Sequence, residues 1–371
     1  MTHVALPDPE RTRRQVGLGL LLVALAFGAG LLLFEVLLPP LLSDDPGEQY
    51  LTMLLGAGFA LPAAVVYLTV PRLLDRYDPE PWYALVGCLA WGGVCATSFS
   101  IPINECGSCV NVGGDAFGTV LVAPIVEEAW KGLGLFGVFY FLRREFDGLV
   151  DGIIYATFIA LAFAAVENVL YYARAASESS EVFAGTLFLR GMLGPWGHPL
   201  YTSMTGIGFG FARETERPWV RWAGPLLGYV GAVALHMTWN GSAVLAGSLG
   251  ESGVMLFVVM LPLWLLFVLV FLLIVVALVH RRGVIIREHL VDEVALGFVT
   301  REEFALVGSA FGTLRARLRW GPLGIELVRA IARLALSKWH STRARRSRTA
   351  TVSFDFIVPL RQRIAALRAQ L

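Results

Sequence analysis

The chain has 371 residues, of which 56% are apolar and only 16% are charged, and its formal net charge is +1. Its mean hydropathy of +0.65 exceeds that of ordinary soluble domains. The composition therefore excludes a soluble globular protein. It predicts an all-α polytopic membrane bundle that contacts membrane lipid, and we expect no nucleic acid as a partner.

Eight segments are long and apolar enough to span a membrane, since a spanning helix needs about 20 apolar residues. In chain order they are 17–42, 51–70, 82–102, 117–142, 149–173, 186–212, 222–247 and 254–279. The first follows three arginines, as a signal peptide would, but its apolar run is longer than that of a signal peptide. We interpret it as a retained helix.

The short loops predict the orientation, because Lys and Arg accumulate on the cytoplasmic side of a membrane. The loops of one face carry Arg72, Arg76, Arg143, Arg144, Arg213, Arg217, Arg221, Arg281 and Arg282, and the N-terminal segment on that face is also basic. The opposite loops contain only Arg174. We therefore expect both termini in the cytoplasm of a bacterial cell and a multi-pass protein of the plasma membrane.

The C-terminal part differs in composition. From His280 to Leu371 it carries seventeen Lys and Arg against seven Asp and Glu, with a capping box from Thr300 to Glu303. We predict a cytoplasmic N-terminus (1–16), a transmembrane domain (17–280) and a small, basic, helical cytoplasmic tail (281–371). A solvated face explains the arginines of the tail more simply than contact with anionic lipid or a partner does.

Cys106 and Cys109 form a CxxC pair in the polar loop between the third and fourth segments. A disulfide and a metal site are both compatible with one such pair. The spacing does not decide between them.

Polar side chains interrupt four of the apolar segments. They are Glu127, Glu128, Lys131, Glu167, Asn168, His198, His236 and Asn240. Ionisable residues inside a membrane are costly and usually functional. With a rise of about 1.5 Å per residue, Glu127 and His236 lie about 15 Å below the outer surface, His198 about 18 Å and Glu167 about 8 Å. This common depth favours a single site that is reached from the extracytoplasmic half.

Each cluster also has a structural explanation. Glu127 and Lys131 could neutralise each other at i, i+4, and the other groups could form hydrogen bonds between helices. Glu128, however, lies about 100° around the helix from Glu127, so Lys131 cannot fully serve both carboxylates. One of them is then free to bind a metal or to deprotonate water.

Carboxylates, imidazoles and amides are the groups that peptide hydrolysis needs to activate water and stabilise an oxyanion. The sequence contains neither a GxSxG motif nor the HExxH zinc pattern. A hydrolytic site inside the membrane is therefore the favoured interpretation.

Several blocks together resemble the signature motifs of the PrsW family of intramembrane proteases, over about residues 71–245. They are Asp75 to Trp82, Glu127-Glu128-Ala-Trp-Lys131, Asp151-Gly152, Phe163-Ala-Ala-Val-Glu167-Asn168, His198 and His236-Met-Thr-Trp-Asn240. The family is similar in turn to the clan of CAAX prenyl endopeptidases and Abi proteins. Glu167 stands where that clan has a histidine.

The resemblance implies cleavage of a membrane-anchored, single-span protein near its extracytoplasmic side, as when a PrsW protein cuts an anti-sigma factor. It implies that Glu127 and Glu128 supply the water-activating carboxylate and that Lys131 holds one of them. His236 would be a ligand or oxyanion donor with Asn240 as its partner, and the Glu167-Asn168 pair and His198 would bind or orient.

The resemblance leaves two mechanisms open. Glu128, Glu167, His198 and His236 would suit Zn²⁺, which agrees with the family's common description as metalloproteases. The alternative is hydrolysis by glutamate and water alone.

Two other classes of function compete. A proton- or ion-coupled transporter would use the same buried charges, but it needs an internal repeat and access from both faces, and the sequence shows neither. A non-catalytic membrane scaffold would act through the basic tail, and the intact motifs argue against it.

Overall fold

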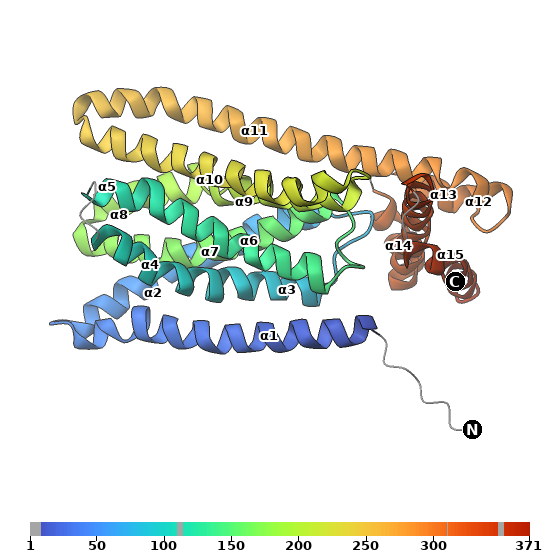
Figure 1. Ribbon diagram of the computed structural model, residues 1–371, viewed down its shortest axis with the longest axis horizontal. Helices are drawn as coiled ribbons and strands as arrows, with labels where there is room; N and C mark the ends of the chain where they lie inside the picture. Colours follow the sequence, from blue (N-terminus) through green and yellow to red (C-terminus); the bar gives the residue numbers. More distant parts are fainter. Residues whose placement is uncertain (1–8, 110–113, 310, 348–351) are drawn as a thin grey trace, which may run out of the picture. The chain divides into compact units, whose positions relative to one another are not determined.

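The computed structural model describes residues 9–109, 114–309, 311–347 and 352–371. These residues form helices and turns with no strand among them, which confirms the all-α prediction (Figure 1). The α-helices are α1 (Pro9–Leu32), α2 (Pro46–Leu74), α3 (Trp82–Ala90), α4 (Thr97–Cys109), α5 (Gly114–Phe117), α6 (Ala123–Phe141), α7 (Leu149–Glu178), α8 (Ser180–Thr186), α9 (Gly197–Glu214), α10 (Pro218–Ser248), α11 (Glu251–Glu288), α12 (Val291–Ala295), α13 (Arg301–Val307), α14 (Gly312–Ser347) and α15 (Ile357–Arg368). Between them lie the π-helical segments η1 (Leu33–Leu37), η3 (Trp91–Ala96), η4 (Gly118–Val122) and η5 (Leu187–Leu193), and the 3₁₀ segments η2 (Pro39–Leu42) and η6 (Val352–Phe356).

The chain divides into two compact units. The first contains Met1–Pro71 and Glu80–Leu272, and the second contains Arg72–Pro79 and Leu273–Leu371. The boundary predicted after residue 280 falls inside α11, a few residues beyond this division. The cytoplasmic placement of the second unit stays a prediction.

Five helical stretches among the described residues are long and apolar enough to cross a membrane. They are Glu10–Leu42, Pro46–Leu74, Trp82–Cys106, Leu149–Glu178 and Val258–Ala295. The remaining three predicted spans, 117–142, 186–212 and 222–247, are also largely helical. The chain is thus a polytopic membrane bundle, and the number of eight spans stays a prediction.

The helix predicted over 186–212 is interrupted. Residues between η5 and α9 leave the helix at Gly194, and α9 restarts at Gly197, immediately before His198 and Pro199. Proline lacks a backbone N–H, so it is tolerated best in the first turn of a helix. The helix is therefore interrupted just before Pro199, and His198 lies at a helix start.

A π-helical stretch likewise precedes Pro124. The segment η4 runs directly into α6, whose second residue is Pro124. Wider π-helical turns commonly occur near functional sites. The proline is accommodated at this junction between η4 and α6, three residues before Glu127.

Glycines bring α7, α9 and α10 into close contact. A Cβ atom on Gly152 would lie 2.2 Å from the carbonyl oxygen of Gly206, and a Cβ on Gly206 would lie 2.2 Å from that of Gly152. Gly208 approaches the backbone of Gly224 in the same way, at 2.3 Å. Small residues are the common means of close helix packing in membranes. Gly152, part of the Asp151-Gly152 motif, therefore serves to join α7 to α9.

Asp151 fixes the start of α7. Its carboxylate is buried and accepts hydrogen bonds from the backbone N–H groups of Asp147, at 2.9 Å, and Gly148, at 3.0 Å. Glu214 accepts a further bond from the N–H of Leu149, at 3.0 Å. These carboxylates satisfy amides that the first turn of a helix leaves unpaired.

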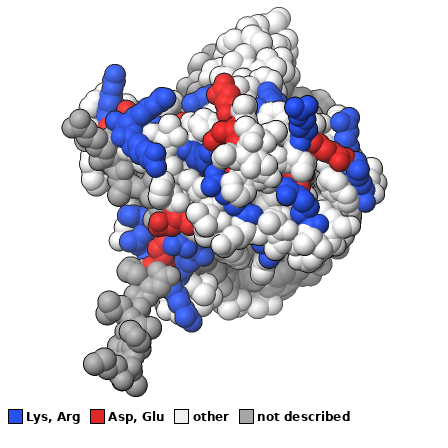
Figure 2. All heavy atoms as spheres, turned by 90° about the vertical axis from the view of Figure 1, so that its right-hand side faces the viewer, with Lys and Arg blue, Asp and Glu red and all other residues white. Residues whose placement is uncertain are grey.

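The second unit is held together by buried carboxylates and arginines. Glu303 accepts two hydrogen bonds from Arg368, at 2.8 and 2.7 Å, and one from the N–H of Thr300, at 2.7 Å. Thr300 in turn accepts from the N–H of Glu303, so the predicted capping box is confirmed. Figure 2 shows Lys and Arg outnumbering Asp and Glu on one face of the molecule.

We predict that replacing Gly206 by alanine lowers the free energy of unfolding by roughly 1–3 kcal/mol, because the added methyl group overpacks the contact with Gly152. Thermal unfolding of the purified protein in detergent would measure the loss. Gly137→Ala in α6 is the matched control, since a Cβ there meets nothing within 4 Å. Equal melting temperatures for the two variants would contradict the packing argument.

The carboxylate of Glu303 generates a pH-dependent prediction. Burial opposes its ionisation, but the hydrogen bonds from Arg368 and Thr300 outweigh that effect and lower the pKa of Glu303 below its ordinary value. A carboxylate with a lowered pKa stabilises the folded state at neutral pH, and this contribution is lost as the pH falls through that lowered pKa.

Glu303→Gln should therefore destabilise α13 by about 2 kcal/mol at pH 7, and its difference from wild type should shrink on acidification. Hydrogen exchange of α13 in the full-length protein, corrected for intrinsic rates, measures both effects. The neighbouring Glu302→Gln serves as the control because Glu302 is half exposed and its pair with Arg319 lies at the surface. An equally large effect of Glu302→Gln would contradict the claim that the buried carboxylate of Glu303 specifically stabilises α13.

Candidate active site

A buried lysine lies at the centre of the polar cluster. The Lys131 side chain, on α6, is 0% exposed. Its Nζ donates to Glu128 Oε1 at 2.9 Å and to Glu127 Oε2 at 3.4 Å. It also lies 3.0 Å from His198 Nδ1 and 3.8 Å from the centre of the Phe163 ring. Lys131 thus pairs with both carboxylates, but more closely with Glu128, as expected if it cannot fully serve the two, and α9 contributes a third partner.

Glu128 is the more fully engaged of the two adjacent carboxylates. Besides Lys131, it accepts a hydrogen bond from Thr202 on α9 at 2.8 Å and lies 3.2 Å from His236 Nδ1 on α10. The side chain is completely buried. Both of its oxygens thus have partners, which fixes their position.

Glu127 has fewer partners. Its Oε1 accepts from the Asn104 amide at 3.2 Å, and its Oε2 lies 4.0 Å from His236 Nε2. The contact with Lys131 is the longer of the two lysine–carboxylate contacts. Glu127 is therefore the carboxylate of the pair that is better placed to bind another group.

The second histidine joins α9 to α7 and η5. His198 Nε2 lies 2.9 Å from Glu167 Oε2. Arg190 donates to the same Glu167 oxygen at 2.5 Å and to the Asn168 carbonyl oxygen at 2.8 Å, and its guanidinium stacks 3.7 Å from the centre of the Tyr171 ring. The adjacent acidic and amide groups that the sequence singled out thus share one arginine.

The hydrogen bonds determine which nitrogen of each histidine carries a lone pair. Lys131 has no acceptor, so His198 Nδ1 accepts and Nε2–H donates to Glu167. The carboxylate of Glu128 similarly receives a bond from His236 Nδ1–H, which leaves the lone pair on Nε2. Both imidazoles are thereby oriented by a carboxylate, an arrangement that commonly supports histidine ligands of metals.

Glu127, His198 and His236 could hold a metal ion. Each offers one ligand atom, and the three atoms lie within 4.8 Å of one another. Ligand atoms around a tetrahedral zinc ion lie about 3.4 Å apart, so binding would draw the three atoms together. Three protein ligands and one open position are typical of a catalytic zinc site. Among the described residues, the cations that contact the carboxylates of Glu127, Glu128 and Glu167 are Lys131 and Arg190, so an added cation would also suit the local charge.

One edge of the cluster is more open than the rest. The side chains of Arg190, Glu167 and His198 are 26%, 19% and 13% exposed, whereas Glu128 and Lys131 are fully buried. A substrate or water would therefore reach the site past Arg190 and Glu167.

Aromatic rings cover the histidines. The Tyr201 ring stacks on His236 with centres 4.8 Å apart, and the two histidine rings lie 5.1 Å apart at nearly a right angle. The Tyr201 hydroxyl is buried and has no hydrogen-bond partner among the described residues. This leaves one donor close to the site for another group.

Asn240, another of the eight predicted site residues, forms its side-chain hydrogen bond outside this network of contacts. Its amide donates to the backbone carbonyl oxygen of Thr119 at 2.9 Å, and so it ties α10 to η4. Its role as an oxyanion partner stays a prediction. Cys106 is exposed, and the side chain of Cys109 lies outside the described residues, as does any pairing between the two.

The sequence interpretation missed three residues that donate hydrogen bonds to the cluster: Arg190, Thr202 and Asn104. Arg190 had a clear signal, since it is a charged residue inside a predicted span. Thr202 follows His198 by one helical turn and so lies on the same face of α9. Asn104 follows the apolar part of its segment, and only the packing of α4 against α6 places it beside Glu127.

The fold defines a polytopic membrane protein with polar residues buried among its helices, and comparison with known proteins identifies the family. Residues 80–274 match the model of the PrsW family of intramembrane metalloproteases. The chain belongs to this family and is an intramembrane protease.

Two relatives are both called Protease PrsW. One, from Geobacillus kaustophilus (strain HTA426), is 29% identical over 178 residues, which cover 47% of this chain and 74% of the relative. The other, from Bacillus subtilis (strain 168), is 28% identical over 171 residues, covering 46% and 73%. No solved structure matches the chain.

Arg190→Gln should lower proteolysis about 10–100-fold, as loss of a group that orients a site residue commonly does. The substitution removes the cation that holds Glu167 and Asn168. Arg190→Lys should recover only part of the activity, because lysine cannot donate along a planar fork to both partners. Initial cleavage rates in liposomes measure the effect.

Arg174→Gln is the control for Arg190, since Arg174 is an exposed arginine on the neighbouring stretch of α7. It should cleave like the wild type. If Arg190→Gln also cleaves like the wild type, the positioning role of Arg190 is wrong.

Proposed function

We propose that this chain is a Zn²⁺-dependent endopeptidase that cuts single-span membrane proteins within the extracytoplasmic half of the bilayer. The observation that carries the proposal is the convergence of Glu127, His198 and His236, from three helices, on one small volume. Their carboxylate-oriented imidazoles are the second support.

We assign the binding of the metal to Glu127, His236 Nε2 and His198 Nδ1. The Nδ1 lone pair that accepts from Lys131 in the structure would then bind the metal, so that Lys131 would keep only its two carboxylate partners. When bound there, Zn²⁺ would polarise the scissile carbonyl and lower the pKa of a water molecule. This assignment differs from the ligand set predicted from the sequence in one respect. Glu127 replaces Glu128 and Glu167, because those two carboxylates already hold the opposite nitrogens of the histidines.

The remaining residues orient the two histidines and balance the charge of the carboxylates. Glu128 keeps His236 in the tautomer that leaves Nε2 free, and Thr202 fixes the second oxygen of Glu128. Glu167 does the same for His198, with Arg190 holding Glu167. Lys131 balances the charge of the Glu127 and Glu128 carboxylates. Without it, these two carboxylates would repel each other in a medium of low dielectric constant.

The substrate class follows from the location of the site. Glu127 lies inside predicted span 117–142, so a peptide bond must enter the membrane to reach it. A single transmembrane helix that unwinds near its outer end would present such a bond. A regulator anchored by one span, such as an anti-sigma factor, is the kind of substrate that we propose, with both termini of the protease in the cytoplasm.

The test uses purified protein in liposomes with a panel of single-span membrane proteins, and mass spectrometry identifies the fragments. We expect wild type to produce a fragment cut near the outer interface, and Glu127→Gln to lower its rate by about 10²–10⁴-fold, the usual contribution of a positioned catalytic group. Chelation should stop cleavage and Zn²⁺ should restore it.

Glu216→Gln, at an exposed carboxylate between α9 and α10, is the matched control and should cleave like wild type. Cleavage that persists in metal-free protein and still requires Glu127 would overturn the Zn²⁺ assignment in favour of glutamate and water alone. Zinc-independent cleavage in Glu127→Gln would overturn the site as a whole.

A further inference from the structure

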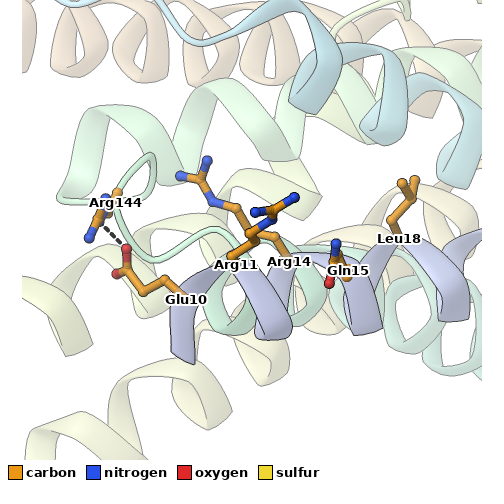
Figure 3. A pocket seen from close by; sticks show the side chains of 6 residues that line it. All are labelled: Glu10, Arg11, Arg14, Gln15, Leu18 and Arg144. Carbon is orange, nitrogen blue, oxygen red and sulfur yellow. Dashed lines mark ion pairs between the residues drawn. The ribbon is translucent and has the colours of Figure 1, made fainter. Parts of the chain in front are cut away.

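A second polar site lies at the N-terminal end of α1, and it shares no lining residue with the Glu127 cluster. A hollow of about 440 Å³ is lined by Glu10, Arg11, Arg14, Gln15, Leu18 and Arg144. Figure 3 shows that Arg144 comes from the turn after α6 and that the other five side chains come from α1. Pockets of this volume hold small molecules.

Close packing brings the two elements together. A Cβ on Gly17 would lie 2.6 Å from Phe141 Cγ, so α1 can approach the end of α6 only because residue 17 is a glycine. Arg14 pairs with Glu145 at 3.0 Å, and Arg144 pairs with Glu10. The packing of Gly17 against Phe141 and the two ion pairs therefore hold α1 against the turn that carries Arg144.

The hollow carries excess positive charge. Three of its lining residues are arginines and one is a glutamate. Two further arginines, Arg13 and Arg143, are sequence neighbours of the lining residues Arg14 and Arg144, and their guanidinium groups lie 5.5 and 5.4 Å from the centre of the Tyr140 ring. Arginine is the side chain best suited to bind phosphate oxygens in pairs.

The hollow also lies at the boundary of the apolar layer. In α1 the basic residues precede the apolar run that begins at Val16, and Arg143 and Arg144 follow the apolar run of α6, which continues to Leu142. Leu18 lines the hollow and is 56% exposed, and only 6% of the apolar 18-residue window of the candidate span Glu10–Leu42 is buried. Apolar surface open to lipid therefore continues from the arginines into the membrane.

We infer that this hollow binds the phosphate headgroup of an anionic phospholipid, with an acyl chain lying along α1 past Leu18. Basic pockets between membrane helices at the level of the headgroups bind such lipids. A free phosphate ion would use the arginines but not the exposed apolar face of α1. The inference does not depend on which side of the membrane the hollow faces or on the protease mechanism.

The test is native mass spectrometry of full-length protein in detergent, titrated with phosphatidylglycerol or with phosphatidylcholine of the same acyl chains. Wild type should retain phosphatidylglycerol preferentially. Arg11→Gln/Arg14→Gln should weaken this binding about fivefold for each arginine, because a charge near an anionic surface contributes roughly 1 kcal/mol. Arg11→Lys, which keeps the charge, should retain most of the affinity.

Arg217→Gln/Arg221→Gln is the matched control, since it removes two arginines from the start of α10, on the face with the same predicted orientation. It should bind phosphatidylglycerol like wild type. Arg11→Gln alone, at an exposed side chain, keeps the test independent of the Arg14–Glu145 pair and should cost about fivefold with an unchanged melting temperature.

Three results would overturn the inference: no preference for phosphatidylglycerol over phosphatidylcholine, an equal loss in both double variants, or an affinity for glycerol 3-phosphate as high as that for the lipid. The last result would show that a free phosphate group, and not a membrane lipid, is the ligand.

Discussion

The structure depends on the burial of the Lys131 ammonium inside a membrane bundle. A charge in that environment costs several kcal/mol unless it is paired and hydrogen-bonded. Lys131 meets this requirement with partners from α6 and α9, namely Glu128, Glu127 and His198. Each partner then needs partners of its own, and these come from α4, α7, α9 and α10. One buried cation thus accounts for a polar network that joins five helices.

The close packing of the helices makes this network possible. The distance between α7 and α9 is set by Gly152 and Gly206, whose backbones touch, and α9 carries both His198 and Thr202. If α7 and α9 lay further apart, the carboxylates of Glu128 and Glu167 would lose the hydrogen bonds that Thr202 and His198 donate to them. Unpaired polar groups are most costly where water is absent. Packing and site chemistry are therefore coupled, and the open edge at Arg190 is the part of the site that remains accessible.

Much of the fold and part of the site could be predicted from the sequence. Apolar length alone locates the helical segments, and the ionisable residues inside them include Glu127, Glu128, Lys131, Glu167, His198 and His236. The capping box from Thr300 to Glu303 is equally local, because a cap needs only residues three apart. Asn240 shows the limit of this reasoning. Its i, i+4 spacing from His236 indicates a shared helix face, yet its amide bonds the carbonyl of Thr119.

The sequence by itself determined that this is a membrane protein, that it is all-helical, and which residue types form its polar cluster. Hydropathy, helix length and the cost of a buried charge are properties of single segments, so they can be evaluated from the sequence. Only the tertiary structure decided which carboxylate faces which histidine nitrogen, and that Arg190, Thr202 and Asn104 join the cluster. Those facts depend on the rotation and spacing of helices far apart in the chain. Contacts between such helices are set by their packing, which cannot be predicted from local sequence patterns.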